Sequence, residues 1–495
     1  MVNFGASRAC QTCKQRRKKC DESRPNCQRC IKAGRVCLGY QENSSVLFRH
    51  YGPPTLNEPP SAVMQTPTSP SGVVIPEPDD EQLERDALAI FFDDYCVESA
   101  DRTISRGFLD GLKPLIDHAG ESSDIAQAAK IVALATTGNR LRRLNILCKT
   151  KQQYGGLLHS FRSTLMRATE SDMVETLMIA VLLGLYEIVS STESDPGQRN
   201  AHVSGVGAIL SNKDSPFDLT TGTRLFQLGN AFLLPESLPQ PENVGLLCAP
   251  SRNGSVLALD GILINVNPIF NLANDLFVAP SCQLEDVRTL RQEAIALERH
   301  ISTWPTRLTG EWAPHVVGNV SEAQLRSSHS PGWPGTVDSY FDLYVAAVWN
   351  TYRKTHLMIL DIIVKCSNYL EPSDVCFELH PKARQLANDI AASIPYHLTN
   401  DAAKYLQHVQ HGVEAQYDGR PVGGLLVLHP LWVVANASVV SHELSTHMRN
   451  ELSWIGHVMG IGQANQLASS RALLSSQHIA QGHVLIWAGM LTQPI

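Results

Sequence analysis

Apolar residues recur at three- and four-residue spacing along most of the chain after residue 80. In the stretch "LERDALAIFFDDYC", Leu88, Phe91 and Tyr95 would share one face of a helix. Comparable stripes occur in residues 124–147, 154–168, 173–189, 344–366 and 383–394. The sequence has no series of alternating apolar and polar segments joined by Asn-Gly or Asp-Gly turns. The pattern predicts a mainly α-helical body over residues 81–495.

The segment before this body has a different composition. Residues 41–80 are rich in Pro, Ser and Thr, and eight prolines fall between Pro53 and Pro78. Such a composition favours extended chain over helix. We therefore expect a disordered linker over residues 41–80.

Two features argue against a membrane-spanning or secreted protein. The longest apolar run begins at Leu177 and is broken by Glu187, short of the roughly 20 residues that cross a bilayer. The first residues, "MVNFGASRACQTC", lack the apolar stretch of a secretory signal. We therefore expect no membrane partner, and thiols rather than disulfides.

Six of the twelve cysteines lie close together near the N-terminus, in the spacing C-x2-C-x6-C-x6-C-x2-C-x6-C. They are Cys10, Cys13, Cys20, Cys27, Cys30 and Cys37. Each half has a close pair, which can share an ion from one face of a helical turn, and then a third thiol. Three thiolates leave a tetrahedral zinc ion one ligand short, but two shared thiolates complete two such ions. The spacing predicts two zinc ions, which would supply the folding free energy that a 40-residue module lacks.

Positive charge is concentrated in the same region. Residues 1–40 hold ten Lys and Arg against Asp21 and Glu22, a net charge of +8, so the other 455 residues carry -15 of the total of -7. This asymmetry indicates a basic module that binds a polyanion, joined to an acidic globular body. The run "KQRRKK" lies between two predicted metal ligands, so its side chains would project in a fixed direction.

The cysteine spacing, the basic run and the proline of "RPNC" resemble the fungal binuclear zinc-cluster transcription factors, whose pattern residues 10–37 match without a gap. The resemblance implies that Cys10 and Cys27 bridge the two ions. One zinc would add Cys13 and Cys20, the other would add Cys30 and Cys37, and Pro25 would shape the turn between the halves. The DNA-binding domain would span residues 1–40.

The body also resembles this family. Residues from about 85 to 490 are similar to the fungal-specific transcription factor domain, which is all-helical. The resemblance lies in "TLMIAVLLGLYEIVSS", "AHVSGVGAIL", "VWNTYRKTHLMIL" and "WIGHVMGIGQANQLA". It implies a regulatory domain over residues 81–495 that restrains the activity or senses a metabolite.

The basic residues are expected to divide into two groups on DNA. The resemblance places Arg16 and Arg17 against base edges of a CGG-type triplet in the major groove, where an arginine fork can donate to guanine O6 and N7. Contacts to phosphate are expected from Arg8, Lys14, Lys18, Lys19, Arg29, Lys32 and Arg35, and contacts of this kind make binding steeply salt-dependent.

No catalytic constellation accompanies these features. In "HELSTH" the histidines His442 and His447 are five residues apart, whereas a metalloprotease helix needs a spacing of four. The sequence also has no G-x-S-x-G elbow and no P-loop pattern. We therefore expect a protein that is not an enzyme.

Together these features predict a nuclear, sequence-specific DNA-binding regulator of RNA polymerase II genes. The resemblance implies control of a fungal metabolic gene cluster, with secondary metabolism as the favoured process. No heptads follow Cys37, so either the body pairs two subunits or the protein binds as a monomer, and we favour a homodimer that meets the transcription machinery or co-regulators. The alternative is a zinc-dependent interaction protein that does not bind DNA directly.

Overall fold

The computed structural model describes most of the body and part of the cysteine region. The described residues are 10, 12–13, 16, 18, 20–21, 23, 27–33, 35, 37, 80–165, 173–192, 202–203, 205–206, 209, 254–263, 265–278, 283–308, 310–370, 379–470 and 485–490. Contacts within the chain divide it into two compact units, Met1–Pro76 and Glu77–Ile495. The predicted linker lies outside the described residues, except for Asp80.

The second unit is mainly helical, as the periodicity predicts. Its described helices are α3 (Asp80–Tyr95), α4 (Leu112–Ala119), α5 (Asp124–Leu141), α6 (Leu144–Leu165), α7 (Met173–Ser190), α10 (Gly254–Leu263), α11 (Val266–Val278), α12 (Leu284–Ile301), α13 (Glu322–Ser328), α14 (Leu343–Leu370), α15 (Leu379–Leu398), α16 (Ala402–Gln410), α17 (Pro421–Asn436), α18 (His442–Val458) and α19 (Gly462–Ser469). Two 3-10 turns cover Pro305–Arg307 and Gly310–Trp312.

The apolar stripe expected over residues 124–147 forms two helices rather than one. The helix α5 ends at Leu141, because Arg142 adopts a left-handed conformation with φ of 53°. The backbone N–H of Arg143 then donates to the carbonyl of Gly138 at 2.9 Å, which closes the last turn. The apolar spacing continues across this turn, so periodicity alone did not reveal the break.

A two-stranded antiparallel sheet interrupts the helices. The strands β1 (His315–Val320) and β2 (Gly335–Ser339) pair from His315 with Ser339 to Val320 with Gly335, with a bulge in β1. Helix α13 lies in the connection between them. A hairpin with a helix in its connection has no two-residue turn, so the sequence contains no hairpin signal here.

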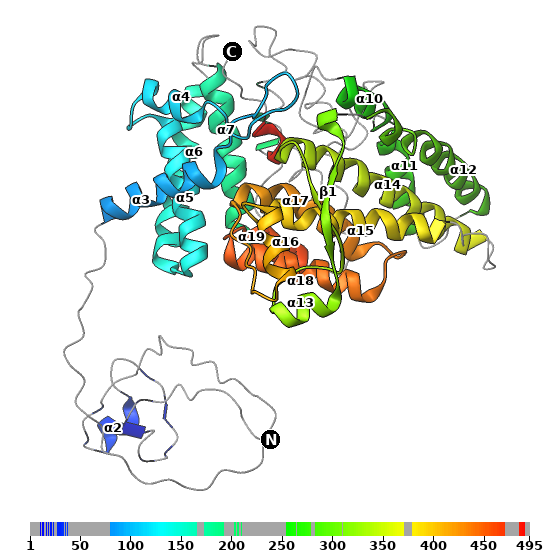
Figure 1. The fold of residues 1–495 in the computed structure, drawn as a ribbon. Helices are drawn as coiled ribbons and strands as arrows, with labels where there is room; N and C mark the ends of the chain where they lie inside the picture. Colours follow the sequence, from blue (N-terminus) through cyan, green and yellow to red (C-terminus); the bar gives the residue numbers. More distant parts are fainter. Residues whose placement is uncertain are drawn as a thin grey trace. The chain divides into compact units, whose positions relative to one another are not determined.

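Helix α17 is the centre of the body. It packs against α14, α15 and α18 (Figure 1), and it is buried from Pro421 to Ala435. A helix that is apolar on all sides is stable only when other helices surround it. At Gly423 the backbone approaches α15 so closely that a Cβ atom would fall on the carbonyl oxygen of His397.

Other helices extend the body on both sides of this centre (Figure 1). Helices α3, α6 and α7 pack against α5, and α12 packs against α14. One hydrophobic core runs through the body, and Phe91, Trp304 and Tyr344 are among its largest fully buried side chains. None of the described helices combines the length and apolar character that a bilayer crossing requires.

Candidate metal centre and nucleic-acid interface

The six N-terminal cysteines form two overlapping groups of sulfur atoms. One group is Cys10, Cys13, Cys20 and Cys27, and the other is Cys10, Cys27, Cys30 and Cys37. Within each group the sulfur atoms lie within 4.8 Å of one another, and Cys10 and Cys27 belong to both groups. Six sulfur atoms thus form two four-membered sets, the number that two tetrahedral ions require.

The distances between the sulfur atoms fit zinc and exclude disulfides. The Sγ atoms are 3.6 Å apart for Cys10 and Cys27, 3.8 Å for Cys13 and Cys27, and 3.9 Å for Cys10 and Cys30. Four sulfurs at about 2.3 Å from a tetrahedral zinc ion lie about 3.8 Å apart. A disulfide bond would need a separation of about 2 Å, and none of the six cysteines forms one.

The thiols need a cation before they can ionise together. Burial raises the pKa of Cys10 and of Cys13 to about 12. The neighbouring sulfur of Cys27 raises the pKa of Cys30 to about 12 as well. Such thiols stay protonated at neutral pH, so a metal ion must displace their protons on binding. The cluster therefore suits a dication and would be unfavourable as bare thiolates.

The two halves repeat one backbone pattern with an offset of 17 residues. The N–H of Cys13 donates to Cys10 Sγ at 3.4 Å, and the N–H of Cys30 donates to Cys27 Sγ at 3.3 Å. The N–H groups of Cys10 and Cys27 donate to Cys20 Sγ and Cys37 Sγ, at 3.5 Å each. The N–H groups of Lys18 and Arg35 donate to the carbonyls of Cys13 and Cys30. The doubled cysteine spacing thus corresponds to a doubled local structure.

The described basic residues of this module are exposed. They are Arg16, Lys18, Arg29, Lys32 and Arg35. Arg29 and Lys32 lie on helix α2 (Gln28–Lys32). Lys18 in the first half and Arg35 in the second half occupy equivalent positions, five residues after Cys13 and Cys30. The other predicted DNA contacts, Arg8, Lys14, Arg17 and Lys19, lie outside the described residues.

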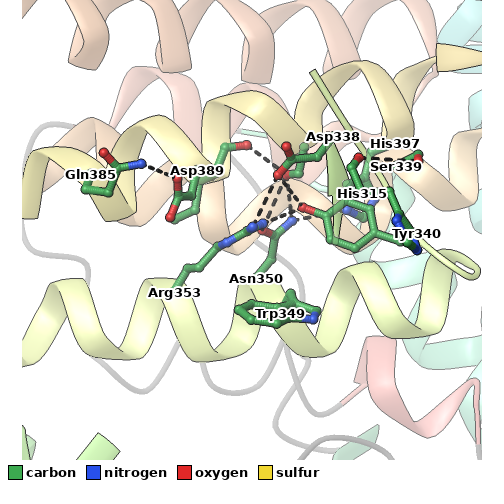
Figure 2. Close-up of polar contacts among 12 residues, drawn as sticks. His315, Asp338, Ser339, Tyr340, Trp349, Asn350, Arg353, Gln385, Asp389 and His397 are labelled. Carbon is green, nitrogen blue, oxygen red and sulfur yellow. Dashed lines mark hydrogen bonds and ion pairs between the residues drawn. The ribbon is translucent and has the colours of Figure 1, made fainter. Parts of the chain in front are cut away.

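The body contains a buried cation that the sequence analysis did not single out. Arg353 of α14 is 3% exposed, and it donates to Asp338 Oδ2 at 3.3 Å and to the Tyr340 hydroxyl at 2.5 Å. Figure 2 shows Arg353 and Asn350 reaching from α14 toward these residues at the end of β2. The rings of Tyr340 and Trp349 flank the guanidinium at 5.7 and 5.3 Å. This ion pair links β2 of the hairpin to α14.

The histidines of "HELSTH" lie on α18. His442 is exposed, whereas His447 packs against Trp333 and lies 3.4 Å from Glu451. Among the described residues, the cysteine groups are the only side-chain sets with metal-binding geometry. Neither histidine belongs to such a set.

Comparisons with known proteins agree with the cysteine geometry. The model of the fungal Zn(2)-Cys(6) binuclear cluster domain matches residues 8–45. Transcription factor dbaG of Emericella nidulans is 37% identical over 415 residues, which is 83% of this chain and 97% of that protein. Transcription activator AMTR1 of Alternaria alternata is 42% identical over 48 residues, 10% of this chain and 6% of that protein. No solved structure matches.

These relatives are regulators of transcription, and none of the matches indicates an enzyme. The matched domain accounts for both the six clustered sulfurs and the exposed basic residues. The chain belongs to the fungal Zn(2)-Cys(6) binuclear-cluster transcription factors, which bind two zinc ions and DNA.

Proposed function

We propose that this protein is a nuclear, sequence-specific regulator of RNA polymerase II transcription that controls a fungal metabolic gene cluster, with secondary metabolism as the favoured process. The observation that carries the DNA-binding part is the sulfur cluster, because exposed basic side chains lie between and beside its cysteines in the sequence. The process is inferred from the family resemblance alone, and 37% identity to a transcription factor over 83% of the chain supports the role in transcription.

In the proposed zinc site, Cys10 and Cys27 bridge the two ions. Cys13 and Cys20 complete one ion, and Cys30 and Cys37 complete the other. The presence of Cys10 and Cys27 in both sulfur groups supports this assignment. When bound, zinc supplies folding free energy and fixes the geometry of the loop between Cys13 and Cys20.

The proposed DNA contacts divide by role. Arg16 and Arg17 read base edges of a CGG-type triplet, and seven residues neutralise phosphates: Arg8, Lys14, Lys18, Lys19, Arg29, Lys32 and Arg35. Five of these nine residues are described, Arg16, Lys18, Arg29, Lys32 and Arg35, and the exposure of all five supports contact with DNA. Phosphate contacts set the register of the module on DNA, and the two arginines supply its sequence preference.

The proposed domain organisation is a DNA-binding domain in residues 1–40, a linker in 41–80 and a regulatory body in 81–495. The division of the chain between Pro76 and Glu77 supports a body that begins near residue 81, and the bound at residue 40 rests on the change of composition. The protein would act as a homodimer and contact the transcription machinery or co-regulators through its body.

Binding-site selection tests the proposal. The zinc-loaded full-length protein is incubated with a random duplex pool, and bound DNA is sequenced over several rounds. We expect enrichment of CGG-type triplets, and the spacing of paired triplets would report a dimer. Failure to enrich any sequence would favour a zinc-dependent interaction protein instead. Genome-wide occupancy would then name the controlled genes.

A further inference from the structure

Asp21 joins the two halves of the zinc module. Its carboxylate accepts a hydrogen bond from the backbone N–H of Gln28 at 3.0 Å and from that of Arg29 at 3.1 Å. The Ser23 hydroxyl donates to the same carboxylate at 2.5 Å. Asp21 directly follows Cys20, the last cysteine of the first half, whereas its backbone partners begin α2 in the second half.

These bonds satisfy backbone N–H groups in the first turn of α2. The first backbone N–H groups of a helix have no partner within the helix. In α2 the N–H of Arg29 donates to Asp21, the N–H of Gln28 is shared between Asp21 and the Ser23 hydroxyl oxygen at 3.0 Å each, and the N–H of Cys30 donates to Cys27 Sγ at 3.3 Å. The negative carboxylate also interacts favourably with the positive end of the helix dipole.

A five-residue helix has little stability of its own, so its direction depends on its attachments, which are the metal ligands Cys27 and Cys30 and the bonds to Asp21. Helix α2 carries the exposed residues Arg29 and Lys32. We propose that Asp21 is a positioning residue for DNA binding, because its bonds to the first turn of α2 set the direction in which Arg29 and Lys32 project. This inference rests on the proposed phosphate contacts of these two residues.

The charge of Asp21 makes the proposal sharply testable. Asp21 is exposed on a basic module that binds a polyanion. By Coulomb's law alone, removal of its negative charge would strengthen binding to DNA. If Asp21 positions α2, the same substitution weakens binding. The two effects have opposite signs.

The experiment measures the affinity of the zinc-loaded full-length protein for a labelled CGG-containing duplex by fluorescence anisotropy at several salt concentrations. The variants are D21A, D21N, K32A and D21A/K32A, and E22Q removes the same charge from the neighbouring residue as a control. We expect D21A to bind about tenfold more weakly, the loss of a charge-assisted contact. The slope of its log affinity against log salt concentration should become shallower by about one, as expected for the loss of one phosphate contact. D21N keeps one acceptor oxygen and should lie between D21A and wild type.

Further outcomes separate the inference from the proposed function. In the D21A background, K32A should add little, because Lys32 is already misplaced. D21A must still bind two zinc ions, as measured by metal analysis. Binding of D21A equal to or tighter than that of E22Q, full additivity with K32A, or loss of zinc from D21A would each overturn the positioning role. If R29A and K32A leave the affinity of the wild-type protein unchanged, the proposed phosphate contacts themselves fail.

Discussion

The carboxyl group of Glu451 on α18 is buried, and the polar groups beside it do little to stabilise a negative charge there. It is 5% exposed, and the Tyr417 hydroxyl donates to its Oε1 at 3.4 Å. His447 lies at the same distance, but burial lowers the pKa of His447 to about 4, so it is uncharged at neutral pH. Tyr405 and Tyr417 are also neutral, since burial raises the pKa of both. Burial raises the pKa of Glu451 itself to about 8.

The shift makes the stability of the body depend on pH. In the unfolded chain Glu451 titrates near the ordinary value of 4.5, and in the folded chain near 8. The folded state therefore holds this proton more tightly. The stability that follows is fully present below pH 4.5 and is lost as the pH rises to 8. At 1.36 kcal/mol per unit, the loss is about 5 kcal/mol.

The substitution Glu451→Gln keeps the shape of the side chain and removes its ionisation. We expect the free energy of unfolding of this variant, relative to wild type, to increase by about 4 kcal/mol between pH 5 and pH 8.5, a window that covers most of the titration. Guanidinium unfolding followed by tryptophan fluorescence measures this difference, because all seven tryptophans lie in the body and Trp454 packs against Tyr417. Since other groups also titrate, the difference between variant and wild type is the relevant quantity.

The matched control is Glu443→Gln, on the same helix but exposed. It should leave the pH dependence unchanged. If Glu451→Gln loses as much stability as wild type between pH 5 and pH 8.5, Glu451 is not buried as a neutral acid and the reasoning is wrong.

Three other predictions concern the metal, the DNA contacts and the core. Chelation of zinc should abolish DNA binding in a gel shift and unfold residues 1–40, and an unchanged affinity would refute the zinc site. Arg16→Ala and Arg17→Ala should reduce discrimination between cognate and scrambled DNA, whereas Lys19→Ala should weaken both about equally; identical behaviour of all three would contradict this division. Gly423→Ala should destabilise the body by about 3 kcal/mol, because its Cβ meets a backbone carbonyl of α15. Gly155→Ala on α6, with nothing within 4 Å, is the control, and equal unfolding midpoints would contradict the close approach.

Local features were sufficient for the helical class of the body and for the type of metal site. The apolar spacing in residues 83–96 predicted α3, because the period of a helix is a property of neighbouring residues. The doubled cysteine spacing predicted two zinc ions from ligand number alone. It did not assign the shared thiolates, which the resemblance implied and which the overlap of the sulfur groups at Cys10 and Cys27 supports.

The sequence did not predict the contacts between residues far apart in the chain, which form only in the tertiary structure. The pairing of β1 with β2, the ion pair of Arg353 with Asp338 and the burial of Glu451 gave no local signal. Arg353 lies in α14, and the apolar periodicity of that helix does not indicate that Arg353 contacts Asp338 of β2. Likewise, nothing in the run from Cys20 to Cys27 indicates that Asp21 binds the start of α2.

The sequence by itself therefore determined the metal ligands as a set, the basic character of the module and the helical class of the body. These features depend on residue type and on spacings of a few residues, and both are properties of the sequence before the chain folds. Tertiary structure decided which side chains are buried together and which of them must be neutral. Burial and its effect on charge depend on residues that come together only when the chain folds.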